Sequence, residues 1–126
     1  MGLEGHYLKQ KKHTRVRFQV DLLDATKITS AQFTIFDFIN NSFTFSHPKK
    51  QLTISLLENL KQQPQTFGEL LTNLNTSKST LYLLCLALER AGMIFKDEQT
   101  KKYKLDAAFT ETLNKYGSWW ETWLKT

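Results

Sequence analysis

The chain has 126 residues, a formal net charge of +5, and 40% apolar and 23% charged residues. This balance excludes a disordered chain, and the length allows one domain with a modest core and short extensions. The longest apolar run, residues 81–88, is too short to span a bilayer, and no apolar segment follows the basic N-terminus as in a secretory signal. A single cysteine, Cys85, excludes an internal disulfide. We therefore expect a cytoplasmic or nucleoid-associated protein without a membrane partner.

The positive charge is concentrated in two segments. Residues 1–17 carry five basic side chains against one acidic one, a balance of +4, and residues 96–104 carry four against two, a balance of +2. Residues 18–48, in contrast, have a net charge of −2. Basic segments of this kind suit a phosphate backbone, because each neutralised phosphate releases counterions. The alternative is a solubilising surface that binds no partner.

The N-terminal part is expected to hold an arm and a small extension. Residues 1–14 lack periodicity and read as a flexible basic arm. The alternation of "RVRFQVDLL" from residue 15 predicts a half-buried strand. The aromatic-rich segment that follows, up to residue 48, is expected to contain a helix over residues 30–41 capped by Ser30. A strand is the alternative there, because aromatic residues also favour β structure.

Residues 49–105 give sharper signals. Leucines at helical spacing predict a helix that Pro64 ends, and Thr66 with Glu69 forms a capping box that opens a short helix to about Leu74. After a turn, Thr76 or Ser77 caps a longer helix that runs to Ala91. Gly92 follows it as a residue free to take a left-handed conformation.

The remaining chain predicts a hairpin and C-terminal helices. "MIFKDE" and "KKYKLD" are two short strand candidates joined by a polar turn. In residues 106–126, Asp106 is expected to cap a helix that breaks at Gly117. Ser118 and Glu121 then form a capping box for a second helix.

This order of elements resembles a winged helix-turn-helix, in particular the regulators of the IclR and MarR types. The stretches that carry the resemblance are "TFGELLTNLNTSKSTLYLL", "LERAGMI" and "KKYKL", which together cover a little under half of the chain. The fold class expected is mainly α with a small β component, a winged helix-turn-helix with N-terminal and C-terminal extensions. The fold alone leaves the function open, because it serves many tasks.

The resemblance implies a transcriptional regulator that binds duplex DNA. Residues 77–91 would then be the recognition helix and residues 96–104 the wing. The expected DNA contacts are Ser77, Lys78, Ser79 and Tyr82 on the helix, Lys101, Lys102 and Lys104 on the wing, and Lys11, Lys12 and Arg15 on the arm. Small hydroxyls and a lysine at a helix N-terminus suit phosphate contacts.

Leu83 and Leu86 depart from this pattern. Regulators of the IclR type commonly place a basic residue at the position of Leu83, where an arginine can pair with guanine. Two leucines left in water would cost on the order of 3–6 kcal/mol. We expect them to be covered by the aromatic segment of residues 33–45, by the C-terminal tryptophans or by a second subunit.

A second resemblance follows from this departure. The N-terminal winged-helix dimerisation domains of small-molecule methyltransferases, which use S-adenosylmethionine, do not bind DNA and have a leucine-rich third helix, and "LYLLCLALERAGMI", "KKYKLDAAFTETL" and "WETWLKT" are similar to them. The alternative function is therefore a dimerisation or interaction module with Leu83 and Leu86 in its interface. No cofactor-binding sheet or glycine-rich loop follows in this sequence.

The C-terminal tryptophans and the titratable residues complete the expectations. Trp119, Trp120 and Trp123 predict a homodimer contact, with stacking on single-stranded bases as the alternative. The scattered histidines and carboxylates form no pattern of a catalytic site. We therefore expect no enzyme activity, no cofactor and no metal.

Overall fold

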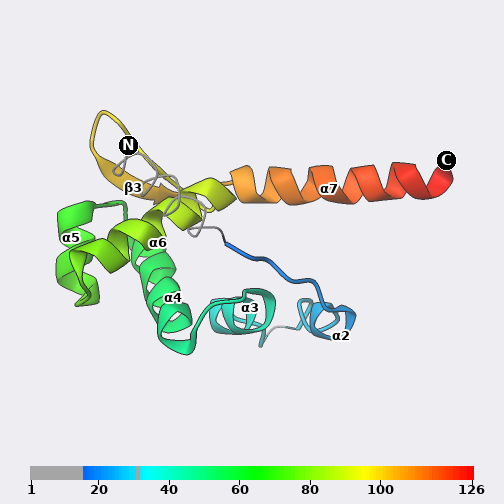
Figure 1. Cartoon of the computed structure of the whole chain (residues 1–126), viewed down its shortest axis with the longest axis horizontal. Coiled ribbons are helices and arrows are strands. Elements are labelled where there is room, and N and C mark those ends of the chain that lie inside the picture. Colours follow the sequence, from blue (N-terminus) through cyan, green and yellow to red (C-terminus); the bar gives the residue numbers. More distant parts are fainter. Residues whose placement is uncertain (1–15, 31) are drawn as a thin grey trace, which may run out of the picture.

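The computed structural model describes residues 16–30 and 32–126, and it is mainly helical with a small antiparallel sheet (Figure 1). The expected fold class, mainly α with a small β component, is confirmed. The elements in chain order are α2 (Leu22–Ala25), α3 (Ile35–Ser42), α4 (His47–Gln62), β1 (Gln65–Thr66), α5 (Phe67–Leu74), α6 (Lys78–Ala91), β2 (Ile94–Lys96), β3 (Lys102–Leu105) and α7 (Ala108–Lys125). The expected arm, with Lys11, Lys12 and Arg15, lies outside the described residues.

The sheet has three strands in the order β1-β3-β2. The predicted hairpin forms β2 and β3, with Ile94 opposite Leu105. β1, which the sequence analysis did not predict, adds Gln65 opposite Tyr103 on the other edge of β3. Two extended residues after Pro64 are too few to show a strand periodicity, and the pairing with β3 is what makes them a strand.

The core lies where α4, α5, α6 and the sheet meet. α6 contributes a buried stripe of Leu81, Leu84 and Leu88, and α4 contributes Leu56 and Leu60. Leu70 of α5 and Ile94 of β2 complete the centre. Each such leucine or isoleucine stabilises the fold by about 1.5–3 kcal/mol on burial, so this cluster fixes the position of α6.

The predicted helix ends in this region are confirmed. The Thr66 hydroxyl accepts from the backbone N–H of Glu69, whose carboxylate accepts from Thr66 in return. The Ser77 hydroxyl accepts from the backbone N–H of Thr80 at 3.2 Å, which caps α6. Gly92 ends α6 with φ +80°, in the left-handed region. Local capping chemistry therefore sets the turn between α5 and α6 and the exit from α6.

Two N-terminal predictions are wrong. In place of a strand over residues 15–23, Phe18 makes an isolated bridge to Phe43, and the chain then turns into α2. The helix in the aromatic segment is present, but Thr34 caps it in a capping box with Asp37, and Ser30 instead forms a turn with the N–H of Gln32. The alternation was misleading because Val20 is 80% exposed and has no strand beside it to pack on.

A cluster of phenylalanines joins this N-terminal extension to the rest of the molecule. Phe18, Phe38 and Phe109 lie within 6.2 Å of one another by ring centroids, and Phe43 contacts all three. The rings come from the N-terminal segment, from α3 and the residue after it, and from α7. Edge-to-face packing of this kind adds to their burial and holds α3 beside the start of α7.

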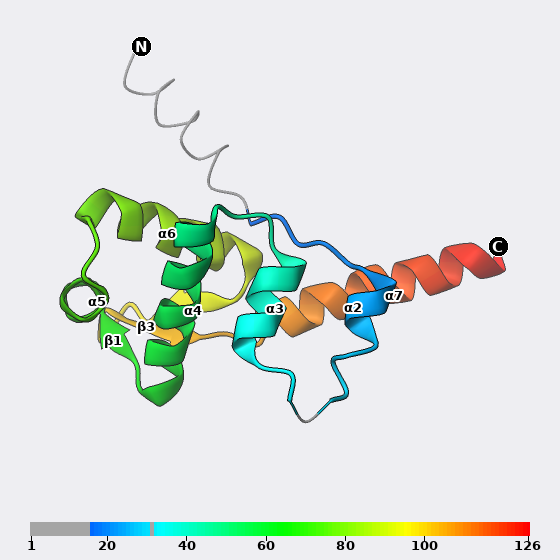
Figure 2. The ribbon, with the colours of Figure 1, turned by 90° about the horizontal axis from the view of Figure 1, so that it is seen from below.

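α7 is one continuous helix, so the predicted break at Gly117 is wrong. Gly117 and Ser118 lie in its interior, and no second capping box forms there. A single glycine costs a helix about 1 kcal/mol, too little to interrupt 18 residues. The predicted cap at Asp106 is also wrong, because Ala107 is the N-cap of α7, and the Asp106 carboxylate accepts from the backbone N–H of Ala108 at 3.1 Å. α7 extends away from the other elements (Figures 1 and 2).

We predict that Gly92→Ala destabilises the protein by about 2 kcal/mol, because φ +80° is strained for alanine and the new Cβ would lie 3.0 Å from the backbone nitrogen of Phe109. Gly68→Ala is the matched control, since it adds a methyl group to a helix without a close contact. Urea unfolding measures both variants. Equal stability of the two variants would contradict the left-handed exit from α6.

Candidate nucleic-acid interface

The first turns of α6 present a polar, basic surface. Ser77, Lys78 and Ser79 are exposed, and Tyr82 is 47% exposed on the same side of the helix. The buried leucines of α6 point to the other side, as a period of 3.6 residues requires. All four expected helix contacts are thus brought together on one accessible surface, with the Ser77 cap leaving the side chains of Lys78 and Ser79 free to face outward.

Leu83 and Leu86 are half-buried in the structure, so they do not form the water-exposed patch that the sequence suggested. The aromatic segment packs on Phe109 and α4, and the C-terminal tryptophans are themselves exposed. Neither group is therefore needed to shield Leu83 and Leu86 from water. The cost estimated for two fully exposed leucines therefore does not arise.

The wing between β2 and β3 is organised by Asp97. Its carboxylate accepts from the backbone N–H groups of Gln99 and Thr100 and from the Lys104 ammonium, at 3.2 Å. These hydrogen bonds lower the pKa of Asp97 from its ordinary value, and the bond from the Gln99 N–H contributes most. Lys101 adopts φ +60° at the turn. The hairpin tip is thereby held in one shape by a charged side chain.

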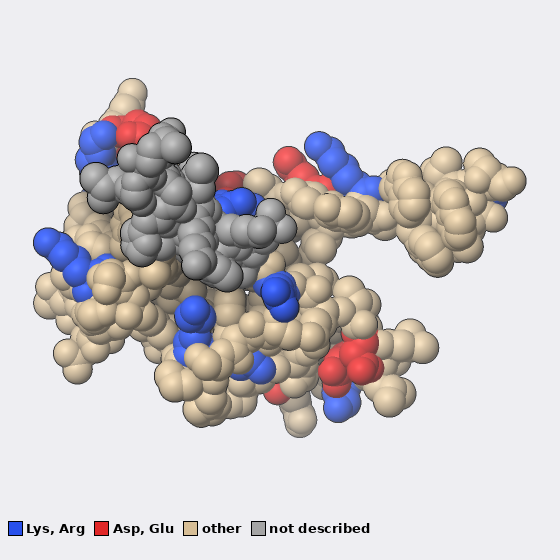
Figure 3. Space-filling view, viewed as in Figure 1, with Lys and Arg blue, Asp and Glu red and all other residues tan. Residues whose placement is uncertain are grey.

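Two of the three expected wing lysines are ion-paired. Lys104 pairs with Asp97, and Lys101 pairs with Glu98 at 3.0 Å on the open surface. Figure 3 shows basic and acidic side chains next to each other at this tip. Lys102 is half-buried beside Thr66 in the sheet, and the Lys96 ammonium lies 5.9 Å from the centre of the Tyr103 ring. An exposed pair such as Lys101–Glu98 contributes about 0–1 kcal/mol, so a phosphate can compete for Lys101.

Sequence reasoning missed the polar group that positions α5. Gln65 is 3% exposed, and its amide donates to the Asn59 carbonyl at 3.1 Å and accepts from the Asn73 side chain at 2.8 Å. It therefore joins the end of α4, the sheet and α5. A buried glutamine cannot be recognised without knowing that β1 exists, because its burial depends on β1 pairing with β3.

Cys85 and Glu89 lie on α6, and their side chains are less exposed to solvent than an ordinary surface group. Burial raises the pKa of the Cys85 thiol to about 12, and burial also raises the pKa of Glu89, against the opposing effect of Lys96. Cys85 is 1% exposed and lies in the core. A protonated, enclosed thiol is neither a nucleophile nor a ready metal ligand.

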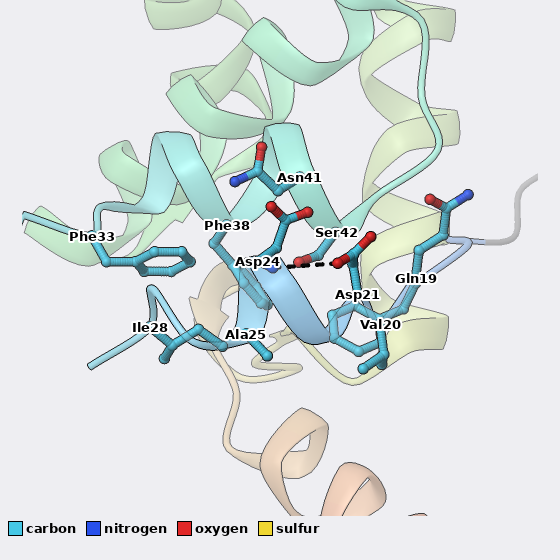
Figure 4. A pocket seen from close by; sticks show the side chains of 11 residues that line it. Gln19, Val20, Asp21, Asp24, Ala25, Ile28, Phe33, Phe38, Asn41 and Ser42 are labelled. Atoms are coloured by element: carbon cyan, nitrogen blue, oxygen red, sulfur yellow. Dashed lines mark hydrogen bonds between the residues drawn. The ribbon is translucent and has the colours of Figure 1, made fainter. Parts of the chain in front are cut away.

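A small pocket of about 50 Å³ lies between α2 and α3 (Figure 4). Phe33 and Phe38 line it, and Asp21 stands at its edge. The Asp21 carboxylate accepts from the backbone N–H groups of Leu23 and Asp24, so it serves as the cap of α2. Among the described residues, no three potential metal-binding side chains come together.

Trp119, Trp120 and Trp123 lie on the part of α7 that extends from the molecule, and all three are more than half exposed. They stack on one another, with Trp120 and Trp123 ring centroids 5.2 Å apart. They are distant along the chain and in Figure 1 from the start of α6, so the structure separates the expected DNA contacts from the expected dimer contacts. Within the described part of the chain, no helix has the length and apolar character to cross a membrane.

Comparison with known protein families, characterised proteins and solved structures gave no match.

Cys85 gives a direct test of the α6 packing. We predict that a thiol reagent at pH 8 labels the native protein far more slowly than the urea-unfolded protein, because burial protects the thiol and a pKa of about 12 keeps it protonated. Absorbance of the released chromophore measures the rate. Labelling of native protein as fast as unfolded protein would contradict the burial of this side of α6.

Proposed function

We propose that this chain is a DNA-binding transcriptional regulator of the winged helix-turn-helix type, with α6 as the recognition helix and the β2–β3 hairpin as the wing. The observation that carries the proposal is the division of α6 into two sides. One side buries leucines against α4, α5 and the sheet, and the other presents Ser77, Lys78, Ser79 and Tyr82 at the N-terminal end. Recognition helices dock in the major groove through their N-terminal residues.

The order α4-β1-α5-α6-β2-β3 supports this assignment. A helix precedes the two helices α5 and α6 and a hairpin follows them, which is the order that the sequence resemblance implied, and β1 adds a third strand that it did not predict. The start of α6 and the wing tip both lie at the end of the molecule opposite the C-terminus of α7 (Figure 1). A duplex lying along that end would meet the helix and the wing together.

The chemistry of the surface suits a phosphate backbone. The free N–H groups and dipole of the first turn of α6 favour an anion, and Lys78 adds a full positive charge there. Tyr82, one turn later, offers a hydroxyl for a phosphate or a ring for a base edge. In this proposal Lys102 provides the wing contact, Lys101 and Lys104 exchange their acidic partners for phosphates, and Lys11, Lys12 and Arg15 extend the contact along the duplex.

A second candidate function is a dimerisation module that does not bind DNA. The acidic side chains at the wing tip favour it, because Asp97 and Glu98 offset the charge of two wing lysines. In that function Leu83 and Leu86 would lie in a subunit interface, and Leu83→Asp would reduce the mass of the oligomer. An unchanged oligomer in Leu83→Asp would exclude this interface.

The salt dependence of DNA binding tests the proposal. We predict that the protein binds a labelled mixed-sequence duplex with micromolar or tighter affinity, and that Lys78→Ala with Lys102→Ala lowers the slope of log affinity against log salt by about two units. Fluorescence anisotropy across a salt series measures the slope.

The control is Lys27→Ala with Lys125→Ala, which removes the same charge from the opposite end of the molecule and should leave most of the slope unchanged. An equal loss in both double variants would show a response to net charge alone. No binding by folded protein at low salt would reject the proposal and favour the dimerisation module.

A further inference from the structure

α7 carries an apolar stripe that its own chain leaves largely uncovered. None of the described α7 side chains is buried, and its large apolar residues beyond residue 115 are between 53% and 72% exposed: Tyr116, Trp119, Trp120, Trp123 and Leu124. Together they form one of the largest exposed apolar surfaces of the described chain. Exposed apolar surface of this extent usually marks an interaction site.

The spacing of this stripe is that of a helix that pairs with another helix. Intervals of four, three, four and three residues separate the members of the series Phe109, Leu113, Tyr116, Trp120 and Trp123. This is the a/d repeat of a coiled coil, which keeps one narrow seam facing a partner helix. Phe109 uses the first position of the seam to join its own core, and the later positions extend beyond it.

The charged residues of α7 avoid this seam. At 100° per residue, Glu111, Lys115, Glu121 and Lys125 all lie on the remaining surface of the helix. Lys125 pairs there with Glu121 at 3.2 Å, on the solvent side. Pairing of two α7 helices along the seam therefore buries rings and methyl groups without burying a charge of α7, which would be costly.

The uncovered part of the seam borders a groove. Tyr116 and Trp120 form one wall of it, and Val16, Phe18 and Val20 from the N-terminal segment contribute to the other. Figure 3 shows the hollow between the extended α7 and the lower part of the molecule, where Figure 1 places α2. Val20 is 80% exposed, so both walls offer uncovered apolar surface to the same occupant.

We propose that this occupant is α7 of a second copy of the chain, and that the two α7 helices pair antiparallel about a two-fold axis at Ser118. In this register Tyr116 faces Trp120 of the partner, and Leu113 faces Trp123 of the partner. Each contact occurs twice, as a two-fold interface requires. The register brings the C-terminal half of each α7 into the groove of the other copy.

The antiparallel orientation follows from the shape of the molecule. The other elements lie at the N-terminal end of α7 (Figures 1 and 2), so parallel helices would bring two bulky bodies to the same place. Antiparallel helices put the bodies at opposite ends and oppose the helix dipoles. Parallel pairing would also set Trp120 against Trp120 and Trp123 against Trp123, whereas the antiparallel register sets Trp123 against the smaller Leu113.

The area is sufficient for a stable contact. A large aromatic side chain buries about 150–250 Å². At their observed exposure, the exposed apolar residues of α7 therefore offer about 500 Å² from each copy: Tyr116, Trp119, Trp120, Trp123 and Leu124. The apolar wall of the groove, including Val20, adds to it. The total over two copies reaches about 1,200 Å², the lower bound of a specific protein interface. This inference concerns α7 alone and does not depend on DNA binding.

Mass in solution tests the pairing. We expect light scattering to give a dimer for the full chain and for Thr122→Glu, and a monomer for Trp123→Glu. The two substitutions are adjacent and introduce the same charge, but only Trp123 lies on the seam. Circular dichroism should show the same helix content for both variants, because Trp123 is more than half exposed. A monomeric full chain, or a dimeric Trp123→Glu, would overturn the proposal.

A short bis-maleimide crosslinker tests the orientation, with Cys85 protected in the core. In the antiparallel register, Gly117→Cys lies beside the two-fold axis and should crosslink two copies efficiently. Leu113→Cys lies five residues from the axis and should crosslink much less. The reverse order of yields would overturn the antiparallel register. DNA binding measured on the monomeric Trp123→Glu separates α7 pairing from the proposed DNA binding. Each copy keeps its lysine surface in this variant, so only the affinity gained from linking two copies is lost.

Discussion

Burial of the leucine side of α6 is the constraint on which the rest of the structure depends. Leu81, Leu84 and Leu88 occupy the space between α4, α5 and the sheet, and they are almost fully buried. Because this side is fixed, the orientation of every other α6 side chain is fixed as well. The Ser77 cap sets where the helix begins and Gly92 sets where it ends, so the helix is held both in rotation and in length.

The outer surfaces of the molecule then divide into two regions with different chemistry. The start of α6 and the wing hold hydroxyls and lysines, together with the acidic pairs at the wing tip. α7 holds aromatic rings along one seam and its charges elsewhere. The phenylalanine cluster ties the start of α7 to α3 and the N-terminal segment, and the seam lies away from the start of α6. A two-fold pair of such chains would carry two recognition helices on one assembly, as a pseudo-palindromic site needs.

Much of the region from α4 to β3 could be predicted from the sequence, because interactions between residues close together in the chain determine it. Capping residues such as Thr66 and Ser77 bond within three residues, and helical leucine spacing needs no tertiary partner. β1 and the role of Gln65 could not be predicted, because both depend on pairing with β3 across some forty residues. The alternation around Phe18 predicted a strand, but no neighbouring strand exists there to complete it. Gly117 was only a weak indication of a helix break, because one glycine lowers the stability of a long helix by too little to interrupt it. The site residues on α6 lie together as expected, whereas the acidic partners of the wing lysines became visible only in three dimensions.

The proposed contact between the outer side of α6 and DNA can be tested by titration of ¹⁵N-labelled protein with a short mixed-sequence duplex at low salt, followed by amide chemical shifts. We predict that the largest changes fall on residues 77–82 and at the turn around Lys101 and Lys102, with little change along α7 beyond residue 115. Changes confined to α7, or an unchanged spectrum, would contradict it.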